Sequence, residues 1–152
     1  MELALYNALL TGMSHDGKQF TYTNQLASSF GSPSKREQWF DCACCPPNIA
    51  RFLGYIGGYI YHSKQTADKG LEIAVLLYTR SATKFPLKEG GDVALQQKTE
   101  YPRNGWIQFK LDAPENTDVT IKLRIPAWAA GYEVSVYHPT SSHLLVELTS
   151  CS

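Results

Sequence analysis

The spacing of hydrophobic residues changes once along this chain, near residue 71, and this change constrains the fold more than any other feature. Over residues 2–13, apolar side chains recur every three or four positions, which predicts a helix. Pro46 and Pro47 mark the start of a second helix, and two glycines end it. From residue 71 onward, Gly, Pro and Asn separate β-branched or alternating runs at roughly 8–14-residue intervals, which is typical of an antiparallel β-sandwich. These runs are residues 71–84, 92–100, 106–111, 118–125 and 132–137.

Helices followed by strands indicate two domains rather than one mixed sheet. We expect residues 1–63 to form a helical domain and residues 71–138 to form the sandwich. A short aromatic strand is expected over residues 19–23. The Ser- and Thr-rich residues 139–152 are expected to form an irregular tail.

The charge balance of the chain excludes some classes of partner. Lys and Arg number 14 and Asp and Glu number 14, so the formal net charge is zero. That balance argues against binding to a nucleic-acid backbone or to an anionic membrane surface. The longest apolar run, residues 73–78, is far shorter than the roughly 20 residues that a membrane span needs. No basic n-region precedes the first helix, so we expect no signal peptide and, by default, a cytoplasmic protein.

Three of the four cysteines cluster at Cys42, Cys44 and Cys45. The Cα atoms of the adjacent pair are about 3.8 Å apart, which is shorter than an unstrained disulfide requires. Thiolates crowded in this way more naturally share a soft metal such as Zn²⁺. The pair also comes directly before the second helix, where unpaired N–H groups and the helix dipole lower a thiol pKa. The cluster therefore predicts a metal site or a nucleophile, and the alternative is a set of small buried hydrophobic residues.

A closed zinc site needs roughly four ligands, and this cluster turns only two or three sulfurs to one point. Asp41, His15 and His62 are the nearby candidates for the remaining positions, but none of them has the spacing of a ligand pair. The sequence therefore leaves the ligand set incomplete.

The cysteine cluster lies in a longer motif, Cys-Ala-Cys-Cys-Pro-Pro-Asn-Ile-Ala-Arg at residues 42–51, which is followed by Gly-Tyr-Ile-Tyr at 58–61. This motif resembles the signature of glycoside hydrolase family 127, whose members are β-L-arabinofuranosidases with a cysteine nucleophile and a bound zinc. Further segments fit the same family in the same order, and the match extends over about residues 2–137. These segments are Ala-Leu-Tyr-Asn at 4–7, Asp-Gly-Lys at 16–18, Phe-x-Tyr-x-Asn at 20–24 and Leu-Arg-Ile-Pro-Ala-Trp-Ala at 123–129.

The resemblance implies a multidomain chain that holds the C-terminal helices of an (α/α)6 barrel followed by an antiparallel β-sandwich. It implies that Cys44 is the nucleophile and a zinc ligand, that Cys45 is a second zinc ligand, and that Tyr22 lines the sugar subsite. The implied substrate is a carbohydrate with non-reducing-end β-L-arabinofuranosides, cleaved with retention. The family's other zinc ligands, in a Glu-x-Cys motif, do not occur in this sequence, and neither does an evident acid/base. We therefore expect this short chain to be inactive alone.

Two other classes of function stay open from the residues. One is a non-catalytic carbohydrate-binding β-sandwich in which Trp106 and Trp128 stack on sugars, although packing in the core is the commoner use of such residues. The other is a small zinc-structured interaction domain in which the cysteines hold the fold.

Overall fold

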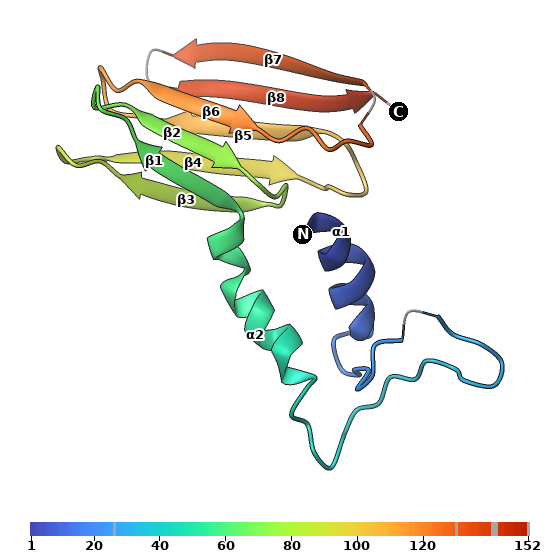
Figure 1. The fold of residues 1–152 in the computed structure, drawn as a ribbon. Helices are drawn as coiled ribbons and strands as arrows, with labels where there is room; N and C mark the ends of the chain where they lie inside the picture. Colours follow the sequence, from blue (N-terminus) through green and yellow to red (C-terminus); the bar gives the residue numbers. More distant parts are fainter. Residues whose placement is uncertain (26, 130, 141–142, 152) are drawn as a thin grey trace. The chain divides into compact units, whose positions relative to one another are not determined.

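The structure is a computed structural model that describes residues 1–25, 27–129, 131–140 and 143–151. The chain divides into two compact units, Met1–Gly57 and Gly58–Ser152. The division falls earlier than the boundary at residue 63 that the sequence suggested. Figure 1 shows helices and loops in the first unit and two β-sheets in the second.

One continuous helical segment opens the first unit, as its hydrophobic spacing predicts. It consists of α1 (Glu2–Ala4), a π-helical stretch (Leu5–Leu9) and a 3₁₀ turn (Leu10–Gly12). The strand predicted over residues 19–23 is wrong, since in this segment only Phe20 pairs, through isolated bridges to Met13 and Glu37. These partners are single residues, one at the end of the first helical segment and one in a loop, so no neighbouring strand extends the pairing.

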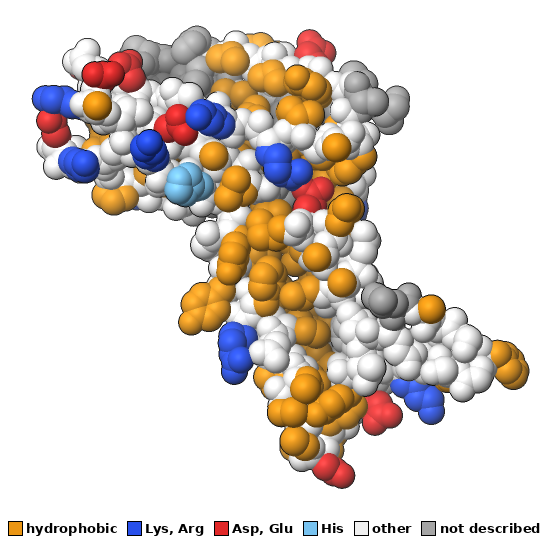
Figure 2. All heavy atoms as spheres, viewed as in Figure 1, with side chains coloured by type: hydrophobic (Ala, Val, Ile, Leu, Met, Phe, Trp, Pro, Cys, Tyr) orange, Lys and Arg blue, Asp and Glu red, His pale blue; other side chains and the backbone are white. Residues whose placement is uncertain are grey.

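The second helix of the first unit is α2 (Pro47–Tyr55), which continues into a 3₁₀ turn (Ile56–Tyr59). It begins at the prolines, because a proline in the first turn has no N–H to leave unpaired. A Cβ atom added to Gly12 would lie 3.0 Å from Cδ1 of Ile49, so the absent side chain allows α2 to approach the first helical segment closely. Figure 2 shows hydrophobic side chains gathered on the exposed surface around α2.

Two sheets form the second unit (Figure 1), and the predicted order of helices followed by a β-sandwich is confirmed. The smaller sheet has the order β1-β2-β6, in which β1 pairs antiparallel and β6 pairs parallel with β2. The expectation of a purely antiparallel sandwich is therefore wrong for one pair, because the intervening strands belong to the other sheet and β6 returns beside β2 by a crossover. The bounds are β1 Tyr61–Gln65, β2 Leu71–Val75 and β6 Val119–Leu123.

The larger sheet is antiparallel throughout and has the order β3-β4-β5-β8-β7. The irregular tail expected over residues 139–152 is wrong where the structure describes it, because β8 pairs with both β5 and β7. Two neighbouring strands satisfy the backbone groups of this segment, so its Ser and Thr content does not prevent strand formation. The bounds are β3 Ser81–Pro86, β4 Asp92–Thr99, β5 Ile107–Asp112, β7 Gly131–Thr140 and β8 His143–Cys151.

The hydrophobic core of the second unit lies between its two sheets. Ile73 of β2 and Phe109 of β5 are completely buried in one cluster, which joins side chains of both sheets. Gln97 of β4 is also completely buried, and its side-chain amide donates to the carbonyl of Thr79 at 2.7 Å and lies 3.2 Å from the hydroxyl of Tyr61 on β1. This amide links the two sheets through a polar contact inside the core.

No helix among the described residues is long and apolar enough to cross a membrane.

Candidate active site

The turn before α2 presents the cysteines. The backbone N–H and the side-chain amide of Asn48 both donate to the carbonyl of Cys45, each at 3.1 Å, and the N–H of Ile49 donates to the carbonyl of Pro46 at 3.0 Å. These bonds form the first helical turn directly after the cysteines. The guanidinium of Arg51 donates to the side-chain oxygen of Asn48 at 2.8 Å and so orients the amide that holds the turn.

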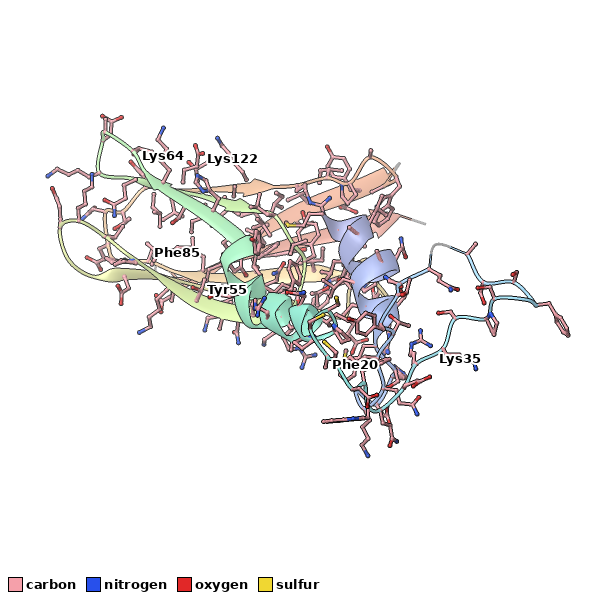
Figure 3. All side chains as sticks on the ribbon, turned by 60° about the horizontal axis from the view of Figure 1, so that its bottom comes forward. Phe20, Lys35, Tyr55, Lys64, Phe85 and Lys122 are labelled. Atoms are coloured by element: carbon pink, nitrogen blue, oxygen red, sulfur yellow. The ribbon has the colours of Figure 1, made fainter. Side chains whose placement is uncertain are left out.

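A short strap, residues 20–24, brings Tyr22 to the cysteines. Phe20, which Figure 3 labels, exchanges two 2.9 Å backbone hydrogen bonds with Glu37. The next residue, Thr21, is buried and donates its N–H to the carbonyl of Gly12 at 2.8 Å, and the amide of Asn24 donates to the carbonyl of Ala8 at 2.6 Å. The strap is therefore tied to the first helical segment on both sides of Tyr22.

The structure brings Tyr22 and Cys44 into direct contact, with 3.0 Å between the Tyr22 hydroxyl oxygen and the Cys44 sulfur. The Tyr22 ring meets the ring of Phe40 edge to face, with 5.4 Å between the centroids. The sulfur of Cys45 lies 3.4 Å from that of Cys44. Three of the residues that the sequence singled out therefore meet at one point, and the contact between the tyrosine and the thiol was not among the predictions.

This contact shifts the ionisation of both groups. The hydrogen bond to Tyr22, followed by those to Cys45 and Cys42, holds the pKa of the Cys44 thiol below its ordinary value. The same hydrogen bond raises the pKa of Tyr22, so the phenol stays protonated and its O–H can donate a hydrogen bond to the Cys44 sulfur. A phenol that can donate to a sulfur favours the thiolate form of that cysteine, which is the form that acts as a nucleophile.

A cavity of about 430 Å³ lies beside this group of side chains within the first unit. Leu5 and Leu9 of the first helical segment line one side, and Ile49 and Phe52 of α2 line the other. Tyr22, Asn24 and Cys45 also reach it, so the strap and the cysteine turn border the same space. Its size is in the range of small-molecule sites, which is about 300–1,000 Å³.

The fit of the cysteines to zinc is partial. Two thiolates on one tetrahedral Zn²⁺, with Zn–S bonds of about 2.3 Å, lie about 3.8 Å apart. The separation of 3.4 Å between the sulfurs of Cys44 and Cys45 is close to that value, so this pair fits two of the four positions. Within the described ranges, no three His, Cys, Asp or Glu side chains meet in a metal-binding arrangement. Of the other candidates, His15 lies in the turn after the first helical segment, and His62 lies on β1 of the second unit.

Two family models match the chain, one for each part. Residues 1–58 match the β-L-arabinofuranosidase GH127 catalytic domain, and residues 72–142 match the β-L-arabinofuranosidase GH127 middle domain. The two matches follow the division of the structure into a helical unit and a β-sandwich unit.

Similar proteins agree with these matches. A non-reducing end β-L-arabinofuranosidase of Bifidobacterium longum subsp. longum is 31% identical over 143 residues, which cover 86% of this chain and 21% of that protein. The crystal structure of a GH127 β-L-arabinofuranosidase from Geobacillus stearothermophilus is 33% identical with a TM-score of 0.76, over 98% of this chain and 27% of that one. A structure of another GH127 β-arabinofuranosidase is 30% identical with a TM-score of 0.78, over 97% of this chain and 27% of that one. The chain therefore spans between a fifth and about a quarter of the length of these relatives.

Proposed function

Because this chain belongs to glycoside hydrolase family 127, of which it holds the end of the catalytic domain and the middle domain, we propose that it carries the nucleophile of a retaining β-L-arabinofuranosidase. The observation that carries the proposal is the 3.0 Å contact between the Tyr22 hydroxyl and the Cys44 sulfur. It selects one of three neighbouring cysteines and lowers the pKa of that one thiol.

In this proposal the reaction takes two displacements. The Cys44 thiolate attacks the anomeric carbon of the arabinofuranoside as the bond from that carbon to the leaving oxygen breaks, and a carboxylic acid gives that oxygen a proton. Water then attacks the same carbon and returns the bonding electron pair to sulfur, while the carboxylate takes the proton of the water. The configuration at the anomeric carbon is retained because it is inverted twice.

Tyr22 has two tasks in this scheme. Its hydroxyl donates to the thiolate, which orients the sulfur and favours its charged form. Tyr22 is 41% exposed and lines the cavity, so in this proposal its ring also contacts the sugar. The strap that fixes Tyr22 thereby also fixes the direction of attack.

Cys44 and Cys45 would hold the zinc that the family uses, as two of about four ligands. Bound Zn²⁺ would keep the coordinated thiols deprotonated at neutral pH. In retaining enzymes the acid/base lies about 5 Å from the nucleophile, on the other side of the bond that breaks. The described lining of the cavity beside the cysteines contains no Asp or Glu, so in this proposal the acid/base and the other ligands come from other residues of the whole protein.

A chimera tests the proposal. Residues 1–152 replace the matching segment of the Geobacillus stearothermophilus relative, and turnover of a chromogenic β-L-arabinofuranoside is measured. Cys44→Ala should lower kcat/KM on the order of 10³-fold or more, because the attacking group is lost. Cys42→Ala, the matched loss of a neighbouring thiol, should keep most of the activity.

Mass spectrometry of the quenched chimera adds a direct readout, a pentosyl adduct on the peptide that contains Cys44. Equal activity of the Cys44→Ala and unsubstituted chimeras would refute the proposal. A folded chimera with no turnover would also count against it, because this segment would then not carry a competent nucleophile.

A further inference from the structure

A second hollow lies on the sandwich, apart from the cysteine site. Its volume is about 590 Å³, and β3, β4 and the loop before β5 form it. Its exposed lining residues combine one aromatic ring with charged and amide side chains. These residues are Arg80, Gln96, Lys98, Glu100, Asn104 and Trp106.

Strand alternation places these side chains on the outer face of the larger sheet. On β4, Val93, Leu95 and Gln97 are buried toward the core, so Gln96 points the opposite way. The partner of Gln96 in the ladder is Ala82 of β3, which is exposed and small. A methyl group where a long side chain would otherwise stand leaves the floor of the hollow open.

Trp106 lines the hollow from a backbone that hydrogen bonds fix. The backbone N–H of Trp106 donates to the side-chain oxygen of Asn104 at 2.8 Å, and its backbone carbonyl accepts from the hydroxyl of buried Thr99 at 2.8 Å. The hydroxyl of Thr99 also accepts from the N–H of Tyr101 at 3.0 Å, so one buried residue fixes both sides of the loop. Trp106 is 37% exposed, and the backbone that carries its indole is fixed before any ligand arrives, which lowers the entropic cost of binding.

The polar side chains of the hollow are available to a ligand. Across the residues that the structure describes, the side chains of Arg80, Gln96 and Lys98 make no hydrogen bond or ion pair. Arg80 and Lys98 are positive and Glu100 is negative, so donors and acceptors surround the ring without a strong excess of one charge. An apolar ring face bordered by several separate hydrogen-bonding groups fits a ligand that has C–H faces and many hydroxyls.

We propose that this hollow is a saccharide-binding site, in which a sugar ring stacks on Trp106 and its hydroxyls bond to Arg80 and Gln96. The volume suits one or two sugar rings of a neutral chain. The site is independent of the chemistry at Cys44, and it would give the sandwich a part in holding a polymeric carbohydrate.

Tryptophan fluorescence of the full chain tests this site directly. The variant W39F/W128F leaves Trp106 as the single indole. Trp128 stacks on Tyr101 with 6.2 Å between the ring centroids, and phenylalanine at position 128 keeps an aromatic ring there. Titration with a soluble arabinan and with arabinotriose should change the Trp106 emission in a saturable manner. No change up to high millimolar sugar would overturn the proposal, as would saturable binding of a single-stranded oligonucleotide in place of the sugars.

Affinity electrophoresis in gels that contain arabinan tests which side chains of the hollow bind the saccharide. Trp106→Ala should weaken binding about tenfold or more. Trp39→Ala, the loss of an exposed indole from the first unit, should leave binding unchanged. Where Trp106→Ala does not fold by circular dichroism, Arg80→Ala and Gln96→Ala answer the same question, because both side chains are exposed. Unchanged binding in these variants would overturn the proposal, and unchanged binding in Cys44→Ala would separate this site from the proposed catalytic one.

Discussion

The two units of this chain differ in how they use their hydrophobic residues. Among the described residues, the first unit buries only Leu5, Gly12, Thr21 and Pro46, while the second buries a continuous cluster that joins side chains of both sheets. Tyr55 of α2 is 70% exposed and Leu3 of α1 is 67% exposed, and Figure 2 shows such side chains gathered around α2. The unit that carries Cys44, the proposed nucleophile, thus has little core of its own, and the continuous core lies in the other unit.

The largest effect expected from this difference concerns activity. The chain of 152 residues, purified alone, should not hydrolyse a chromogenic β-L-arabinofuranoside with zinc and reductant present. The chemistry needs a nucleophile and a separate acid/base around one glycosidic oxygen, and the described lining of the cavity beside the cysteines contains no Asp or Glu. The control is the Cys44→Ala chain, and turnover above that control would show that the first unit holds an acid/base that we have not identified.

The next effect is on stability. Phe109→Ala removes a completely buried ring from the sandwich and should lower the free energy of unfolding by about 3–5 kcal/mol. Ile49→Ala, in α2 of the first unit, removes a half-buried side chain. It should lower the free energy of unfolding by less than about 1 kcal/mol. Denaturant melts followed by far-ultraviolet circular dichroism measure both. An equal cost for the two variants would mean that the units share one core.

The difference between the units also explains how much of the fold the sequence predicts. Periodicity finds the first helical segment and most strands, because each of these elements buries one face. It misses β8, whose partners in the sheet are the distant strand β5 and the preceding strand β7, which forms the edge. It also misses the parallel pairing of β2 with β6, because a local pattern contains no information about which distant strand becomes a neighbour.

A smaller effect concerns the thiol itself. Hydrogen bonding to Tyr22 lowers the pKa of Cys44, so the thiolate should form at lower pH than in a free cysteine. Tyr22→Phe removes that bond, and the midpoint of the alkylation rate against pH should then move upward. Tyr55→Phe, at an exposed tyrosine of α2 labelled in Figure 3, is the matched control and should leave the midpoint in place. The measurement uses metal-free chain in which the other three cysteines are serine, and an unmoved midpoint in Tyr22→Phe would remove the basis for selecting Cys44.

The candidate site contains one contact that the sequence alone does not predict. The cysteine motif identifies the thiols, and the resemblance to the family suggests Tyr22. The bond between Tyr22 and Cys44 joins residues 22 positions apart across loops without regular structure. Its existence depends on backbone bonds of the strap to Gly12 and Ala8, and nothing in the periodicity of the sequence encodes these.

The smallest effect lies on the outer surface of the sandwich, at the ion pair between Lys122 of β6 and Glu72 of β2, which lie 2.8 Å apart. Figure 3 labels Lys122 on this face, next to Lys64. The hydrogen bond from Lys122 holds the pKa of Glu72 below its ordinary value, so its stabilising effect is present at neutral pH and is lost as the pH falls through the lowered pKa. Both side chains reach solvent, and exposed pairs of this kind contribute little. Lys122→Ala should therefore lower the unfolding midpoint slightly at pH 7 and not at all in acid where Glu72 is protonated, and Lys84→Ala, at an exposed lysine of β3 that is not among the groups acting on Glu72, serves as the matched control. A loss at pH 7 comparable to that of Phe109→Ala would show that this face is covered, and the sandwich would then not be an independent unit.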